Sequence, residues 1–222
     1  MNDYIVLIRR KLSPDAGVDV MHDLHEALKI HQAPLVFFHG DGVEATSAIA
    51  AGWAAANPAV DWCMCRTSLE RRSAVDALPA SFTIASLVTF YQAVLSASRV
   101  DSLGLGGTFA SGSDPSEEQS STRLLLDVGY APSGQRQRRE TLEMALGAAA
   151  LELDASVLFH GDGLAHLAGD AARAWAQVTD FGLLGMYGET PGRPFGSEIV
   201  VQNVNAAQAA RMRARAVTIL IL

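Results

Sequence analysis

The sequence predicts an α/β protein made of two tandem three-layer α/β/α units. Each is expected to hold a mainly parallel sheet of four to five strands with helices on both faces. The segment Phe-His-Gly-Asp-Gly occurs twice, at 38–42 and at 159–163. An apolar run precedes each copy and an alanine-rich segment follows it, a pattern typical of a buried strand, a tight turn and a helix. Strand-like and helix-like segments alternate along the rest of the chain, which favours parallel sheets.

In each unit the expected strands and helices alternate. The strands expected in the first unit are 4–9, 34–39, 60–65 and 100–103, and its helices are 19–30, 44–56, 69–78 and 84–98. The strands expected in the second unit are 123–128, 156–159, 198–202 and 217–222, and its helices are 138–151, 169–181 and 205–215.

A linker is expected between the units. Residues 104–122 are rich in Gly and Ser and have almost no apolar residues after Phe109. We therefore divide the chain into a domain at 1–105, a linker at 106–121 and a domain at 122–222. The alternative is one sheet of about nine strands, but an internal repeat predicts two separate cores.

Composition indicates a folded protein with apolar cores, because 49% of the residues are hydrophobic and 18% are charged. The formal net charge is -7 at pH 7, which disfavours direct binding to nucleic acid or to anionic lipid. The sequence has no apolar run long enough to span a membrane, and residues 1–6 resemble a strand rather than a signal peptide. We expect a cytoplasmic protein that binds no membrane.

The two cysteines, Cys63 and Cys65, stand one residue apart at the end of an expected strand. Thr67 and Glu70 have the spacing of a capping box, which predicts a helix from about Ser68. Cys65 is thus expected at the carboxyl end of a parallel strand, just before a helix, where α/β proteins bind ligands.

The surroundings of Cys65 favour a reactive thiolate, which is the nucleophilic form of cysteine. A helix N-terminus attracts negative charge, and Arg66, Arg71 and Arg72 add positive charge nearby. Cys63 points to the same face but deeper, so we expect it to pack. The alternative is that both cysteines are small buried hydrophobic residues. We expect no metal site, because the histidines do not cluster with the cysteines.

The repeated turns are candidates for a pocket or an interface. Their glycines permit a positive φ or a close backbone approach, and their N–H groups can line an anion pocket. The alternative is a structural turn in which the aspartates act as local caps. The histidines have the same place in both units, although only the first unit has a cysteine, which favours a structural or interface role. The residues concerned are His39, Asp41, Gly42, His160, Asp162 and Gly163.

The first unit resembles the DsrE/TusD proteins of the sulfur-relay family. The resemblance rests on the apolar strand and Asp-Gly-Val turn at 35–43, on a strand ending in Cys65, and on the pair Arg71 and Arg72. The segment from 86 to 100 is similar to the last helix and strand of that family. Ser73 stands where the family has glycine after the arginine pair.

The second unit resembles the partner subunit, DsrF/TusC. The similar segments are 139–146, the Asp-Gly-Leu turn at 162–164, and 183–188. The order of the two units matches neighbouring genes of that system, so the resemblance implies a natural fusion. We expect the matching strand of this unit to end at 201–203 without a cysteine, which leaves this half as a structural partner.

The resemblance implies sulfur relay, in which an exposed Cys65 of lowered pKa accepts sulfur as a persulfide and passes it on, as a sulfurtransferase without a cofactor. The implied partners are sulfur donor and acceptor proteins, a third subunit similar to DsrH/TusB, and further copies of the chain in a homo-oligomer. The implied pathway is either tRNA thiolation or sulfur oxidation.

Two other functions remain open. One is a non-catalytic assembly module, favoured by Ser73 and by the second unit's lack of a cysteine. The other is a protein that binds an anion or a small molecule at the repeated turns.

Overall fold

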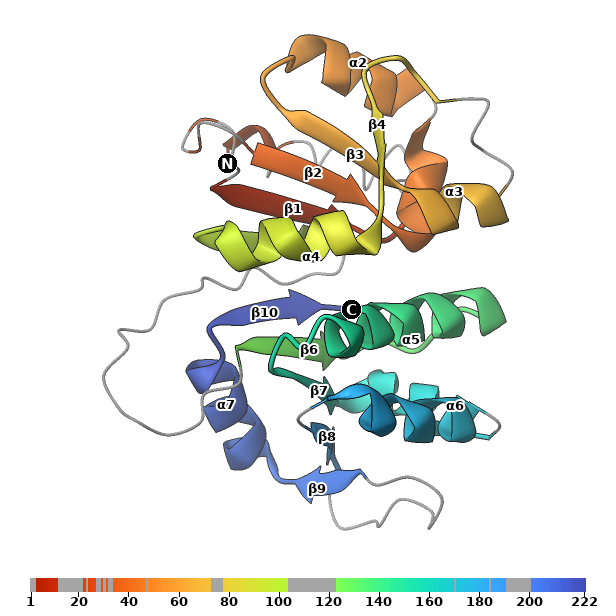
Figure 1. The fold of residues 1–222 in the computed structure, drawn as a ribbon, viewed down its shortest axis with the longest axis vertical. Helices are drawn as coiled ribbons and strands as arrows, with labels where there is room; N and C mark the ends of the chain where they lie inside the picture. Colours follow the sequence, from red (N-terminus) through yellow and green to blue (C-terminus); the bar gives the residue numbers. More distant parts are fainter. Residues whose placement is uncertain are drawn as a thin grey trace. The chain divides into compact units, whose positions relative to one another are not determined.

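A computed structural model describes residues 3–11, 22, 24–26, 29, 31, 34–46, 48–72, 78–103, 123–169, 171–183, 185–190 and 201–222. The chain divides into two compact units, Met1–Ala110 and Ser111–Leu222. Each unit has its own five-stranded sheet, drawn in Figure 1 as a separate set of arrows. The predicted α/β class with two units is confirmed, and the single nine-stranded sheet is wrong. The expected linker, Ser73 and much of the expected helix 19–30 lie outside the described residues.

The sheet of the first unit has the strand order β4-β3-β2-β1-β5, and every pair of neighbouring strands is parallel. Its strands are β1 (Tyr4–Ile8), β2 (Pro34–Phe38), β3 (Asp61–Cys65), β4 (Thr83–Ala85) and β5 (Arg99–Leu103). Its helices include η1 (Gly40–Thr46), α2 (Ala48–Ala56), α3 (Arg66–Arg71) and α4 (Leu87–Ser96).

The second sheet has the equivalent order β10-β6-β7-β8-β9, and it is parallel throughout. Its strands are β6 (Leu124–Val128), β7 (Ala155–Phe159), β8 (Gly185–Glu189), β9 (Gln202–Val204) and β10 (Thr218–Ile221). Its helices include α5 (Gln135–Ala150), η3 (Gly161–Leu167), α6 (Ala171–Val178), η4 (Thr179–Phe181) and α7 (Ala206–Arg215).

Helices cover both faces of the first sheet. Phe37 of β2 contacts Phe90 of α4, with ring centroids 4.7 Å apart. Its neighbour Phe38 points to the opposite face, where it belongs to a core that includes Trp53 of α2 and Leu69 of α3. Burial on both faces explains why β1 and β2 are apolar at every position rather than at every second one.

The second unit repeats this layering. Leu158 shares a core with Ala209 of α7, whereas Phe159 packs its ring at 90° against Trp175 of α6. α7 therefore corresponds to α4. Equivalent residues, Ser86 and Asn205, cap these two helices, and each side chain accepts a hydrogen bond from the backbone N–H three residues later.

The backbone geometry of each repeated turn requires glycine at two positions. Gly40 and Gly161 adopt positive φ values of 60° and 50°. Gly42 and Gly163 lie against the ends of β1 and β6, where an added Cβ would overlap the carbonyl oxygens of Ile8 and Val128. No other residue fits there without moving the turn away from the sheet.

Several predicted elements are wrong. β4 and β8 were not expected, and the helix predicted at 84–98 begins only after the strand β4. The predicted capping box is also absent: α3 begins at Arg66, its N-cap is Cys65, and no side chain caps it. The chain turns into the helix directly at the end of β3, so Thr67 lies inside the first turn. Most of the strand predicted at 198–202 lies outside the described residues, and the strand described at its end is β9 at Gln202–Val204.

In the part of the chain that the structure describes, no helix combines the length and the apolar character that crossing a bilayer requires.

Candidate functional site

Cys65 is the last residue of β3 and the N-cap of α3, at the carboxyl edge of the first sheet. Its backbone pairs with Ala85 of the neighbouring strand β4. The residue is only 1% exposed. The expectation of an exposed thiol is therefore wrong for this conformation, because the helix that follows Cys65 begins without a loop that would open the strand end to solvent.

Cys63 is also buried, on the same face of the sheet as Cys65. Burial and the nearby charge of Asp61 raise the pKa of its thiol to about 11. Cys63 is therefore protonated at neutral pH. This arrangement agrees with its expected role in packing.

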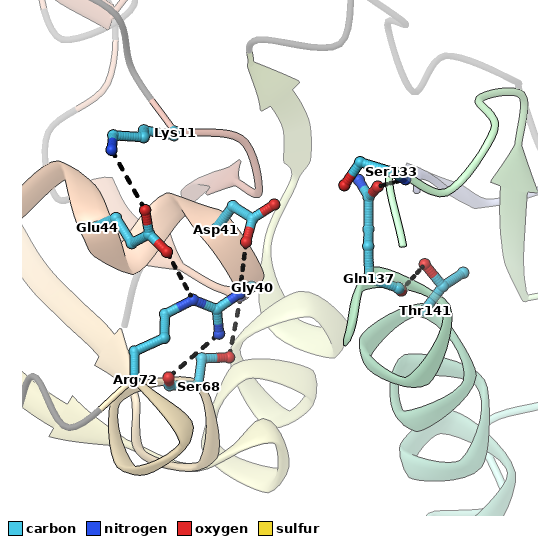
Figure 2. Close-up of polar contacts among 9 residues, drawn as sticks. All are labelled: Lys11, Gly40, Asp41, Glu44, Ser68, Arg72, Ser133, Gln137 and Thr141. Carbon is cyan, nitrogen blue, oxygen red and sulfur yellow. Dashed lines mark hydrogen bonds and ion pairs between the residues drawn. The ribbon is translucent and has the colours of Figure 1, made fainter. Parts of the chain in front are cut away.

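Arg72 joins α3 to the repeated turn of the first unit. One of its nitrogens, Nη2, lies 2.6 Å from Asp41, and its Nε lies 3.4 Å from Glu44. Figure 2 shows the guanidinium group between these two carboxylates. Ser68 of the same helix accepts a hydrogen bond of 3.0 Å from the backbone N–H of Gly40. Side chains of the segment 66–72 thus hold the repeated turn of the first unit against α3, at the carboxyl ends of the strands.

The three arginines predicted near Cys65 have different surroundings. Arg66 is exposed and Arg71 is half-buried. The side chain of Arg72 is only 3% exposed, and its charge is offset by the two carboxylates. Asp41 is therefore an ion-pair partner rather than the local cap that the sequence suggested.

His39 comes directly after Phe38, the last residue of β2, and Cys65 comes directly after Met64 of β3. Phe38 and Met64 are paired in the sheet. The register therefore places His39 and Cys65 side by side at the ends of neighbouring strands. His39 is buried, and its Nδ1 has no hydrogen-bond partner among the described residues. Burial holds the pKa of His39 well below its usual range. Positive charge lowers this pKa further, and it comes from Arg9, Arg72 and Arg71.

The same register identifies the residue that replaces Cys65 in the second unit. Phe159 pairs with Gly188 of β8, as Phe38 pairs with Met64 of β3. Glu189 therefore takes the place of Cys65. The expectation that the matching strand ends at 201–203 is wrong, because that segment belongs to β9, the counterpart of β4. The unit has no cysteine in either case.

His160 belongs to a charged cluster that the sequence did not reveal. Its Nε2 lies 3.0 Å from Oδ1 of the buried Asp127. Arg213 of α7 donates two hydrogen bonds to the same carboxylate, from Nε at 2.7 Å and from Nη2 at 3.1 Å. Burial by itself would raise the pKa of Asp127, but the hydrogen bonds from His160 and Arg213 outweigh it and lower this pKa.

This cluster adjoins a half-open pocket of about 420 Å³ at the carboxyl edge of the second sheet. The residues that line it are His160, Gly161, Leu164, Glu189, Thr190, Val204, Asn205 and Ala206. Asp162 is exposed, and η3 has His160 as its N-cap, without a side-chain bond. The predicted capping role of Asp162 is therefore wrong.

Sequence reasoning missed Asp127, Glu189 and Arg213 as members of one site. Asp127 is a charged residue inside an apolar strand, Leu124–Val128, and this was the one local signal. Within the described ranges, no three His, Cys, Asp or Glu side chains form a group that could hold a metal ion. No protein-family model matches the chain, and no curated protein matches it either.

Proposed function

We propose that this protein relays sulfur in the cytoplasm as a persulfide on Cys65. The observation that carries the proposal is the position of Cys65 at the carboxyl edge of a parallel sheet, beside His39 of the neighbouring strand. Ligands bind at this edge in open α/β sheets. The resemblance to the DsrE/TusD proteins supports the same residue.

The surroundings of His39 support an anionic sulfur at this edge. Three positive side chains act on the imidazole and disfavour its cationic form. These positive side chains also favour the approach of an anionic sulfur donor to this edge of the sheet. His39 itself stays neutral, and its unpartnered Nδ1 can accept a hydrogen bond from a thiol or a persulfide S–H.

The proposed transfer balances without an oxidant. The Cys65 thiolate attacks the terminal sulfur of a donor persulfide, R–S–SH, and a new S–S bond forms. The S–S bond of the donor breaks, and the donor leaves as a thiolate that takes up a proton. Cys65 then holds the sulfur as Cys–S–SH until the thiolate of an acceptor protein repeats the attack.

The burial of Cys65 adds one requirement, which is that the strand end must open before a donor reaches the sulfur. The contacts that would have to open are those of Arg72 with Asp41 and Glu44 and that of Ser68 with Gly40. Local opening of a short surface helix costs less free energy than global unfolding. We propose that docking of the donor protein supplies this opening.

Persulfide loading tests this function. The protein is incubated with glutathione persulfide, and its intact mass is then measured. Wild type and Cys63→Ser are expected to gain the mass of one sulfur atom, whereas Cys65→Ser gains none. Equal loading of Cys65→Ser and wild type would show that Cys65 is not the acceptor.

The second candidate function is a non-catalytic assembly module, and the burial of Cys65 is the observation that favours it. It predicts a Cys65 thiol that reacts with iodoacetamide no faster than free cysteine at neutral pH, both before and after a donor protein is added. It also predicts a stable complex with a partner subunit in the Cys65→Ser variant. Persulfide loading at Cys65 excludes it.

A further inference from the structure

We propose that the second unit has a ligand site of its own, in the pocket beside His160 and Glu189, and that this site binds a small organic molecule carrying a protonated amine. The site is independent of the proposed function of Cys65.

The pocket has the size and the location of a small-molecule site. Its volume of about 420 Å³ lies within the usual range for such sites. It opens at the carboxyl edge of the second sheet, where β8 and β7 end and α7 begins. Leu164, Val204 and Ala206 supply an apolar wall for a hydrocarbon group.

His160 is held in one orientation at this pocket. Its Nε2–H donates to Asp127, so its Nδ1 is the nitrogen that remains to accept a hydrogen bond. The ring lies over Gly129, where an added Cβ would come within 2.6 Å of Cε1 and 2.7 Å of Nε2. Only glycine at position 129 leaves room for the ring, and the His160 side chain remains 34% exposed.

The exposure of His160 distinguishes it from its counterpart. His39 has the same place in the repeat, yet it is buried, and Arg9 stands in the first unit where Gly129 stands in the second. A histidine that only filled the turn would be buried in both units. The second unit instead presents its imidazole to an open pocket.

Glu189 gives the pocket its charge. Among the described residues that line the pocket, it is the one Asp or Glu, and none of them is a lysine or an arginine. Its carboxylate receives no hydrogen bond from the described residues, and among these residues its ion pair is a long one, 3.9 Å to Nη1 of Arg213. Arg213 makes its two short bonds to Asp127 instead, so Glu189 is left available to a ligand.

The two ionisable side chains of the described lining, His160 and Glu189, therefore offer hydrogen-bond acceptors, and Glu189 adds a negative charge. A ligand that satisfies them must bring donors, and an ammonium group brings three together with a positive charge. The apolar wall favours an alkyl chain beside that ammonium group. An aliphatic primary amine combines these properties.

Titration of the full-length protein with n-butylamine tests the proposal, with butyrate and butan-1-ol as probes of matched size. Backbone amide shifts in NMR spectra report both the affinity and the location. We expect butylammonium to shift amides of residues 160–164 and 189–190, with a dissociation constant about tenfold below those of the other two probes.

Two variants and one matched control complete the test. Glu189→Gln is expected to weaken butylammonium binding about tenfold, because it removes the charge and keeps the shape. Ala206→Leu places a larger side chain at the pocket wall from an exposed position and is expected to weaken binding by a similar factor. Ala207→Leu, at the next exposed position of the same helix, is expected to bind as wild type does.

Equal affinity for butylammonium and butyrate would overturn the proposal, as would wild-type binding by Glu189→Gln or by Ala206→Leu. Shifts confined to other residues would overturn it as well. We expect Cys65→Ser to bind butylammonium as wild type does, and Glu189→Gln to load persulfide normally. Failure of the amine site is therefore distinguishable from failure of the relay.

Discussion

Glu189 occupies in the second unit the position that Cys65 occupies in the first. Cys65 is the last residue of β3, and Glu189 is the last residue of β8. Cys65 directly follows Met64, the partner of Phe38, and Glu189 directly follows Gly188, the partner of Phe159. The two sheets share one strand order, yet one presents a thiol at this position and the other a carboxylate. The repeat thus preserves a framework and changes the chemistry at this strand end.

The first prediction concerns the two thiols. Titration with Ellman's reagent at about pH 8 should find Cys63 unreactive in the folded Cys65→Ser variant, because its pKa of about 11 leaves little thiolate. The same thiol should react at once when the protein is unfolded in urea. Cys63→Ser is the matched variant, and it should react in its folded state at a rate limited by local opening. Rapid reaction of folded Cys65→Ser would contradict the burial of Cys63.

The second prediction concerns the ion pairs that close α3 over the turn. Arg72→Met should lower the free energy of unfolding by about 2 kcal/mol, because it removes charged hydrogen bonds and takes the guanidinium group away from Asp41, whereas Glu44 keeps its ion pair with Lys11. Urea unfolding measures this change. The same variant should speed the alkylation of Cys65 by iodoacetamide.

Arg66→Met is the control for this effect, because Arg66 is exposed in the same helix. It should change stability by less than about 0.5 kcal/mol. Equal alkylation rates in Arg72→Met and wild type would show that these ion pairs do not limit access to Cys65.

The third prediction concerns pH. Unfolded His39 takes up a proton as the pH falls through about 6.5, whereas folded His39 stays neutral because its pKa lies well below that value. The unfolded state then binds more protons, so the free energy of unfolding falls by about 1.4 kcal/mol for each pH unit between 6.5 and the folded pKa. Urea unfolding at about pH 7 and about pH 5 should show this loss in wild type.

His39→Gln should lose less stability than wild type over the same pH range, because glutamine does not titrate. His25→Gln removes an exposed histidine and should keep the pH dependence of wild type. An unchanged pH dependence in His39→Gln would mean that another group causes the loss.

The fourth prediction concerns the repeated turns. Gly42→Ala and Gly163→Ala should each lower the free energy of unfolding by about 3 kcal/mol, because the new methyl group overlaps the carbonyl oxygen at the end of β1 or β6. Gly52→Ala is the matched control, because it lies in α2 with no atom within 4 Å of the added Cβ. It should raise stability by about 0.5–1 kcal/mol. Thermal unfolding of the three variants checks the order, and a mild effect at Gly42 would argue against the tight turn.

Much of the fold was predictable because its signals are local. Buried strands such as Tyr4–Ile8 and Pro34–Phe38 are apolar throughout, and α5 has a long run of good helix formers. The strands that were missed lack such signals. β8 contains two glycines among its five residues, and β4 is only three residues long. Their partners in the sheet, rather than their own sequences, make these segments strands.

The candidate site divides in the same way. The sequence indicated Cys65 and both repeated histidines, because they directly follow or end recognisable strands. It did not indicate the contact of His160 with Asp127 and Arg213, since Arg213 is 86 residues from Asp127 in the chain. Nor did it indicate that Cys65 is buried, because that depends on how the segment 66–72 closes against a turn about thirty residues earlier.

The sequence by itself determined the two repeated units, their α/β class and the presence of a cysteine in only the first, because apolar periodicity and glycine turns act over a few residues. Only the tertiary structure decided that Glu189 matches Cys65, that Arg72 closes the first turn and that His160 faces an open pocket. Strand register, burial and ion pairing join residues far apart in the chain, so their outcome depends on packing rather than on any local pattern.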